Sequence, residues 1–289
     1  MNVDRLLIPA TLEIYVWDVE HGNCLTLKTH DGRVAMIDFG MNTSTDFSPA
    51  QFVARVWGVE RLDYLIVSHP HLDHIRDIAN VKKLTPRVLH RRHIATDRLV
   101  TGEYAEYESL IREYVEFEES YRHPLTIDDN PANWSIEFAN FDVCKDGENV
   151  NDLGVATFVS CGGFTLFHPG DVEKDGWDCL LEKKDFTNML ERTSFLMASH
   201  HGRESGFSTD IFRFCTPKLT IVSDGRYGDT SATSRYSTTT EGWAVYDSGL
   251  TTYERRKVVT TRNDGRIRIR VDVQDRSTNV HVDRKPITK

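Results

Sequence analysis

Ser68-His69-Pro70-His71-Leu72-Asp73-His74 decides how this chain folds, because it places three imidazoles and a carboxylate within six residues. It follows an apolar tripeptide, which predicts a strand that ends in a short irregular loop. In extended backbone, residues two apart point the same way, so His69 and His71 can converge on one metal ion. The chain then turns, and Asp73 and His74 can face a second ion beside the first. The alternative is a polar loop whose histidines cap the next helix, but four ligand types in six positions favour metal binding.

The pattern His69-x-His71-x-Asp73-His74 resembles the signature of the metallo-β-lactamase superfamily. The resemblance implies an α/β fold, a four-layer αββα sandwich with a dinuclear metal site along its edge. Neutral imidazole and carboxylate are donors that suit zinc, or with more oxygen manganese or iron. We therefore expect two divalent metal ions, zinc first and manganese as the alternative.

The bulk composition is that of an ordinary soluble globular protein, with 39% hydrophobic and 27% charged residues in 289. The apolar runs are far shorter than a membrane span, and the N-terminus carries no secretory signal pattern. Five dispersed cysteines without a CxxC pair indicate reduced thiols. We therefore expect a single cytoplasmic domain over residues 1–289, without a membrane partner. The net charge of -9 argues against broad nucleic-acid affinity, but not against a local basic groove.

The N-terminal part predicts three strands, over residues 12–17, 24–29 and 34–37, and a helix that begins at Ser48-Pro49. A further helix is expected from about Asp73 to about residue 82. The resemblance gives Asp38, at the end of the third strand, a supporting role beside the metal loop. His21 could line the site, although a loop histidine bonded to backbone is the preferred interpretation.

Residues 95–150 are expected to form a helical insertion. Seven glutamates and regularly spaced apolar residues between Glu103 and Tyr121 predict an amphipathic helix with an acidic outer face. A solvated face is the simpler interpretation, and a lid or partner-binding element is the alternative. Asp128-Asp129-Asn130-Pro131 predicts a loop, and we expect a flexible tail from about residue 275 to 289.

The second half predicts a hairpin around Cys161-Gly162-Gly163 that leads to Asp171. By its position, the resemblance assigns Asp171 as the carboxylate that bridges both ions. It also assigns a later histidine to the site, for which His200 is preferred as the ligand. His201 is the alternative ligand, or a catalytic residue that contacts substrate. The wider superfamily has a third histidine for the first ion, and no clear equivalent is evident here. One branch of the superfamily often has Asn and Ser near this point, and that resemblance makes Asn151-Asp152 a candidate in its place.

Further motifs resemble one branch of the superfamily, the metallo-β-lactamase domain of bacterial competence DNA-uptake proteins and their soluble relatives. These are Asp18-Val19-x-His21-Gly22, Pro169-Gly170-Asp171, His200-His201-Gly202 and residues 258–265. The resemblance spans roughly residues 12 to 272 apart from the insertion. The membrane channel of the competence proteins is missing, so DNA transport is not implied.

The resemblance implies a hydrolase in which two ions lower the pKa of a shared water and polarise the scissile group. Asp73 would orient the resulting hydroxide and accept a proton. We expect a phosphodiesterase, and a nuclease in particular, because Arg266, Arg268 and Arg270 share one strand face that could contact phosphates. Arg235 and Tyr236 are further candidates for phosphate contacts.

Two other functions stay open at this stage. One is hydrolysis of a small non-nucleotide ester, lactone or amide. The other is a metal-stabilised interaction module with protein partners in a multi-component bacterial system. A solvated strand face is the simpler interpretation of the arginine row.

Overall fold

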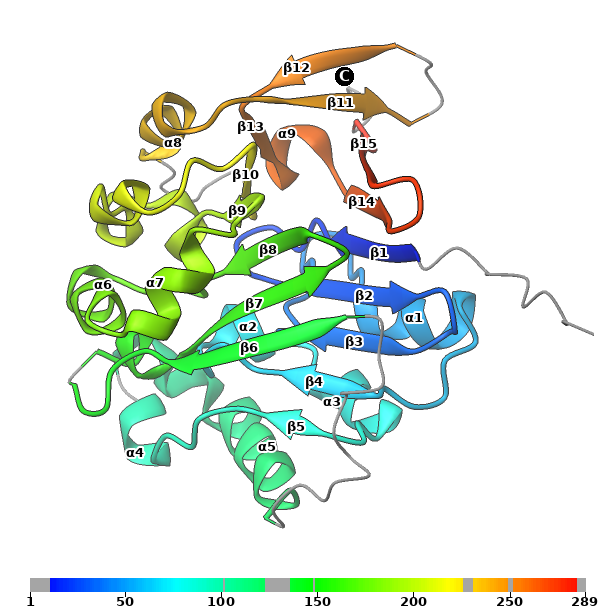
Figure 1. The fold of residues 1–289 in the computed structure, drawn as a ribbon. Helices are drawn as coiled ribbons and strands as arrows, with labels where there is room; N and C mark the ends of the chain where they lie inside the picture. The colour runs from blue at the N-terminus through cyan, green and yellow to red at the C-terminus, as the bar shows by residue number, and fades with distance from the viewer. Residues whose placement is uncertain are drawn as a thin grey trace, which may run out of the picture.

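The computed structural model describes residues 11–100, 102–122, 136–147, 149–225, 231–248 and 252–284. Within these residues, two β-sheets pack face to face, and helices cover both outer surfaces (Figure 1). This arrangement is the four-layer sandwich that the family resemblance implies.

The larger sheet has nine strands. Their spatial order is β12 (Tyr253–Arg256), β11 (Trp243–Asp247), β15 (Ser277–Val282), β14 (Ile267–Asp272), β1 (Thr11–Val16), β2 (Leu25–Thr29), β3 (Val34–Ile37), β4 (Tyr64–Ile66) and β5 (Leu89–His90). The smaller sheet contains β13 (Val258–Thr260), β10 (Leu219–Val222), β9 (Phe195–Met197), β8 (Phe164–His168), β7 (Val155–Cys161) and β6 (Glu137–Asp142). Strands β3, β4 and β5 are parallel, and so are β8, β9, β10 and β13.

Side chains alternate between the two faces of each sheet. In β2, Leu25 and Leu27 are fully buried between the sheets, whereas Thr26 points to the opposite face. There Thr26 accepts a hydrogen bond of 2.9 Å from the Trp17 indole nitrogen. Each fully buried leucine contributes about 1.5–3 kcal/mol of hydrophobic stabilisation. The core between the sheets therefore supplies a rigid frame for the loops at its edge.

Helices cover the outer face of each sheet. The nine-stranded sheet packs against α1 (Pro49–Val56), α3 (Ile78–Val81) and α5 (Glu108–Glu119), and the six-stranded sheet packs against α6 (Lys174–Leu181), α7 (Lys184–Leu190) and α8 (Thr233–Thr239). Shorter helices are α2 (Leu72–Ile75), α4 (Thr96–Leu99) and α9 (Thr261–Asp264). The 3-10 turns are η1 (Lys82–Leu84), η2 (Gly102–Tyr107), η5 (Asn151–Leu153), η6 (Ser199–Gly202), η7 (Glu204–Gly206) and η8 (Asp210–Arg213).

The predicted start of α1 is confirmed in detail. The Ser48 hydroxyl accepts a 3.0 Å hydrogen bond from the Gln51 backbone N–H, and Pro49 is the first helical residue. Gly58 follows the last turn with a φ of 68°, a left-handed conformation that favours glycine after a helix. None of the helices in the described part of the chain has the length and apolar character that a membrane span needs.

Four expectations need correction. The flexible tail is wrong as far as Val282, because β15 pairs with both β14 and β11. The insertion is not wholly helical, since it includes β6, which pairs with β7. The cysteines are not all reduced, because the loop after β6 packs on α6 and joins Cys144 to Cys179 in a disulfide. The predicted loop at 128–131 lies outside the described residues.

The fourth correction concerns the acidic face of α5. Glu118 is buried, with 1% of its surface exposed, and lies on the inner face of the helix. Its carboxylate lies 2.5 Å from His93 Nδ1 and 3.5 Å from Arg91 Nε, both beside β5. One of the seven glutamates therefore fixes the helix to the sheet, while others face solvent.

Candidate metal centre

The candidate site lies where parallel strands of both sheets end. β4 leads into the His-rich loop, β8 leads to Asp171, and β9 leads to His200 and His201. The carboxyl ends of parallel strands meet at one edge of a sheet, so segments far apart in sequence converge there (Figure 1). Gly170 makes one close approach possible: its φ is 65°, and a Cβ there would lie 2.9 Å from the Ser68 Cβ.

Four side chains form the tightest group of metal-ligand types among the described residues. Asp73, His74, Asp171 and His201 each place one ligand atom within 4.8 Å of all the others. His201 Nε2 lies 3.1 Å from Asp73 Oδ2 and 3.3 Å from Asp171 Oδ2. His74 Nε2 lies 3.3 Å from Asp171 Oδ1. This group can hold one ion.

A second pair of histidines also approaches Asp171. His69 Nε2 is 3.1 Å from His71 Nδ1 and 3.7 Å from Asp171 Oδ2. Asn151, in η5, lines a cleft together with His71 and Asp171. Its buried Oδ1 has no hydrogen-bond partner among the described residues. Asp152 instead turns away, and its carboxylate accepts a 2.8 Å hydrogen bond from the Glu173 backbone N–H. Of the two candidates, Asn151 is therefore the one whose side chain lines the cleft.

Hydrogen bonds at the far side of two rings select their tautomers. Asp38 Oδ2 lies 2.8 Å from His74 Nδ1, and Asp38 also accepts bonds from the Ser68 N–H at 2.7 Å and the Ser68 hydroxyl at 2.6 Å. His201 Nδ1 lies 2.9 Å from the Ser223 carbonyl oxygen. A carboxylate and a carbonyl only accept, so Nδ1 is the donor in both rings, and each Nε2 faces the cluster, where loss of its proton leaves a lone pair for a metal ion. Asp38 thus has the supporting place that the sequence indicated.

His200 and His201 exchange the roles that the sequence predicts. His201 joins the cluster, whereas His200 Nδ1 lies 2.8 Å from Glu173 Oε1 and its Nε2 lies 3.1 Å from Arg203 Nη1. Both backbones are left-handed, with φ of 48° and 54°, which costs roughly 1–3 kcal/mol per residue. The preference for His200 assumed a regular strand end, and this turn rotates the second imidazole inward instead.

The turn is held from below. Ser199 donates its hydroxyl to the Val172 carbonyl oxygen at 2.6 Å. Its backbone N–H donates to the Tyr236 hydroxyl at 3.2 Å. Tyr236 is only 1% exposed, so it supports the His200–His201 turn and does not reach substrate, contrary to expectation.

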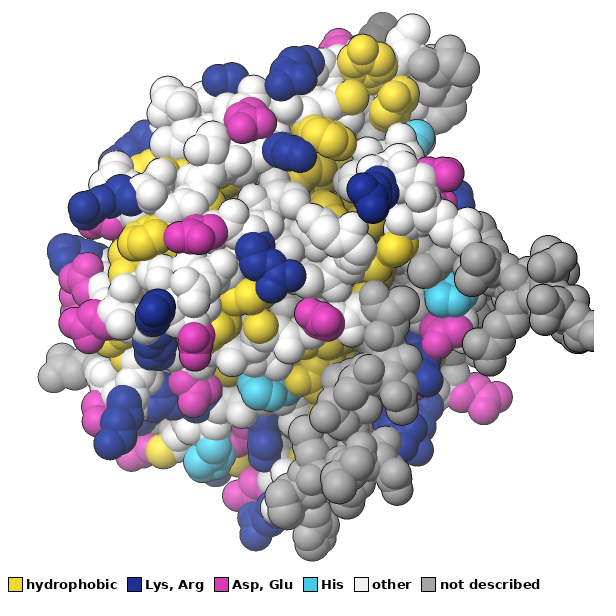
Figure 2. Space-filling view, viewed as in Figure 1, with side chains coloured by type: hydrophobic (Ala, Val, Ile, Leu, Met, Phe, Trp, Pro, Cys, Tyr) yellow, Lys and Arg dark blue, Asp and Glu magenta, His cyan; other side chains and the backbone are white. Residues whose placement is uncertain are grey.

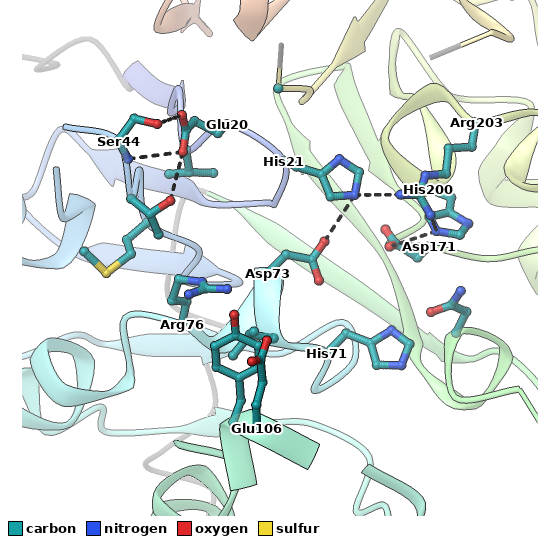
Figure 3. Close-up of a pocket in the computed structure, with 17 residues that line it drawn as sticks. Glu20, His21, Ser44, His71, Asp73, Arg76, Glu106, Asp171, His200 and Arg203 are labelled. Atoms are coloured by element: carbon teal, nitrogen blue, oxygen red, sulfur yellow. Dashed lines mark hydrogen bonds and ion pairs between the residues drawn. The ribbon is translucent and has the colours of Figure 1, made fainter. Parts of the chain in front are cut away.

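A cleft of about 740 Å³ opens over the cluster (Figure 3). In Figure 3, Asp73 lies between Arg203 and His21 on one side and Arg76 on the other. The Arg76 guanidinium stacks over the Tyr107 ring at 5.2 Å, so the first part of the insertion contributes a wall of the cleft. His21 lines the cleft rather than bonding to backbone: its Nε2 lies 3.1 Å from Arg203 Nη2 and 3.8 Å from Asp73 Oδ2.

The sequence of the chain matches one known protein family. A family model described as the metallo-beta-lactamase superfamily matches residues 17–202, well over half of the chain. The chain belongs to this superfamily. A protein from Parabacteroides distasonis, whose name proposes a metal-dependent hydrolase, matches with a TM-score of 0.43 and 12% identity, over 76% of this chain and 86% of its own. A protein from Thermotoga maritima, whose name proposes a metallo-beta-lactamase, matches with a TM-score of 0.34 and 14% identity, over 59% of this chain and 80% of its own. No curated protein matches the chain.

The site fits the divalent ions that metallo-β-lactamase superfamily members bind. Burial opposes ionisation of Asp171, but His201, His74 and His69 outweigh it and hold the pKa of Asp171 well below its usual range. Burial likewise opposes ionisation of Asp73, and His74 and His201 lower its pKa. Two ionised carboxylates among imidazoles are the environment that a cation completes, and within the described parts of the chain the buried Asp171 Oδ1 and Asn151 Oδ1 accept no hydrogen bond.

In this superfamily member, the predicted arginine row lies away from the cleft. Arg266, Arg268 and Arg270 are on the outer face of the nine-stranded sheet, beside Tyr15 in β1. Arg266 pairs with Asp283 at 2.6 Å, and none of the three lines the cleft. Strand alternation predicted their common face correctly, but the position of that face depends on sheet order, which the strand alone does not reveal.

Arg235 is also outside the cleft, because it pairs with Glu204 at 2.5 Å and stacks over Phe207 at 4.0 Å.

Figure 2 shows one face of the molecule, on which described basic and acidic side chains are interspersed.

Proposed function

We propose that the protein is a dinuclear-metal-dependent phosphodiesterase. The observation that carries the proposal is that Asp171 lies close to His69 of the His69–His71 pair and also to His74 and His201 of the Asp73–His74–His201 group. A single carboxylate that two sets of ligand side chains approach suits two neighbouring ions. Two arginines line the cleft above it and favour an anionic substrate.

The residues divide into two ligand sets that share Asp171. His69, His71 and Asn151 would hold the first ion, and Asp73, His74 and His201 would hold the second. Bound divalent ions supply Lewis acidity and a water of lowered pKa. Zinc suits the imidazole-rich composition, and manganese suits the added oxygens.

Asp73 is the residue that orients the attacking water in this proposal. It is 20% exposed in the cleft and receives a 3.1 Å contact from His201, which holds the carboxylate in place. Its lowered pKa keeps it ionised at neutral pH, so it accepts a hydrogen bond from water and is a weak base. Its contribution is therefore mainly orientation.

The narrower parts of the proposal concern the substrate. A cleft of about 740 Å³ is large enough for a nucleotide-sized phosphodiester. Nuclease activity would rest on Arg76 and Arg203 rather than on the arginine row. Membership of the competence-protein branch is part of the proposal too, and rests on the sequence motifs.

A matched set of substrates tests the proposal. Protein loaded with zinc or manganese should hydrolyse bis(p-nitrophenyl) phosphate faster than p-nitrophenyl acetate. Asp73→Asn should lower turnover by about 100-fold, within the usual range for a catalytic carboxylate. Asp63→Asn is the control, because Asp63 accepts a 2.9 Å bond from the Val34 N–H away from the cleft.

Three results would contradict the proposal. Hydrolysis of the neutral ester alone would favour a small-ester or lactone hydrolase. Metal binding without turnover of any substrate, including single-stranded DNA, RNA and cyclic nucleotides, would favour an interaction module. Full activity of Asp73→Asn would remove the orienting role.

A further inference from the structure

Arg203 is held between two imidazoles at the wall of the cleft. Its Nη1 lies 3.1 Å from His200 Nε2, and its Nη2 lies 3.1 Å from His21 Nε2. Because a guanidinium only donates, both imidazole nitrogens must accept. His21 is 182 residues away in sequence, so the fold itself brings these three side chains together. The two contacts fix the plane of the guanidinium.

The guanidinium has no carboxylate partner among the residues that the structure describes. Other half-buried arginines do pair: Arg256 with Asp264 at 2.5 Å, and Arg262 with Asp224 at 3.2 Å. Arg203 Nε is buried and makes no hydrogen bond within the described structure. A half-buried cation without a carboxylate and a buried Nε–H donor without an acceptor are both unfavourable until an anion supplies them.

Its position relates it to the ligand residues. Arg203 follows the His200–His201 turn, and its partner His200 has Nε2 3.8 Å from Asp171 Oδ2. Its other partner, His21, has Nε2 3.8 Å from Asp73 Oδ2. The guanidinium is therefore adjacent to both carboxylates of the centre without pairing with either, and it faces the same cleft (Figure 3).

We propose that Arg203, oriented by His21 and His200, binds the anionic oxygen of the substrate next to the metal centre. The inference rests on the proposed phosphodiesterase function and adds to it the residue that selects an anion. The planar fork of the guanidinium matches two oxygens of a phosphoryl group, which a lysine ammonium does not. His21 and His200 are positioning residues in this arrangement, because they hold Arg203 rather than the substrate.

The test compares Arg203→Gln, Arg203→Lys and wild type, each loaded with the same metal. Arg203→Gln should raise KM for bis(p-nitrophenyl) phosphate by about 10- to 100-fold, the usual loss for a charge-assisted hydrogen bond. Arg203→Lys should lie between Arg203→Gln and wild type. Turnover of neutral p-nitrophenyl acetate should differ from wild type by less than about threefold in both Arg203 variants. Arg213→Gln is the control, because Arg213 is an exposed arginine that pairs with Asp210 at 3.6 Å outside the cleft.

Calorimetric titration with inorganic phosphate separates this inference from the proposed function. If wild type hydrolyses no phosphodiester, phosphate should still bind wild type and bind Arg203→Gln about 10- to 100-fold more weakly. The inference is overturned if phosphate affinity is unchanged, if both substrates lose activity equally, or if Arg203→Gln loses its metal. The last two results would make Arg203 a support for His200.

Discussion

Asp38→Asn tests how the metal loop is held. Asp38 is fully buried, and its φ of 57° is a conformation that asparagine also tolerates, so the backbone should be preserved. If the new amide oxygen keeps the 2.7 Å bond to the Ser68 N–H, the amide NH2 faces His74 Nδ1 at 2.8 Å. His74 then accepts at Nδ1 and carries its proton on Nε2, where the lone pair should face the ion.

The expected loss is one charge-assisted hydrogen bond, about 1.5–3 kcal/mol. This corresponds to roughly 10- to 100-fold weaker binding at the Asp73–His74–His201 site, in line with other residues that support metal ligands. The metal affinity of the other site should change by less than about threefold. Titration with zinc against a chromogenic chelator resolves the two steps, with Asp63→Asn as the matched control. Two steps unchanged from wild type would refute the tautomer argument.

Three further predictions concern the ligand histidines, the disulfide and Tyr236. In the metal-free protein, burial lowers the pKa of His201 and His74, but Asp171 and the neighbouring carboxylates outweigh it. They raise the pKa of His201 to about 9 and also raise the pKa of His74. Binding of a metal ion at their site at pH 7 should therefore release about two protons. Affinity should thus rise with pH up to about 9, and calorimetry in buffers of different ionisation enthalpy that shows no release would contradict this. Cys144 and Cys179 are 35 residues apart, so replacing both with serine should lower the free energy of unfolding in urea by up to about 4 kcal/mol. An unchanged urea midpoint would exclude a stabilising disulfide. Tyr236→Phe should lower the free energy of unfolding by about 1–2 kcal/mol in the same assay, because the buried Ser199 N–H loses its acceptor. Stability equal to wild type would show that this hydrogen bond does not stabilise the protein.

Local chemistry made the metal loop predictable. The spacing of His69, His71, Asp73 and His74 after an apolar strand needs only strand periodicity and ligand chemistry for its interpretation. Asp171 needed the family resemblance as well, because a Gly-Asp pair by itself is a common turn. The same local rules predicted the start of α1.

The remaining parts of the site depend on contacts that single-sequence patterns do not contain. Which of two adjacent histidines turns inward is set by the left-handed backbone at both, and by the buried Tyr236 beneath them. The contact between Arg203 and His21 joins segments 182 residues apart. Strand β15 could not be predicted from its sequence, because Val280 and Val282 are its only large apolar side chains.

The stoichiometry of bound metal tests the central claim most directly. After dialysis, elemental analysis should find about two divalent ions per wild-type chain. Asp171→Asn keeps the shape of the side chain but removes the charge shared by both ligand sets, so it should retain at most one ion. One ion in wild type, and the same single ion in Asp171→Asn, would contradict a dinuclear centre organised around this carboxylate.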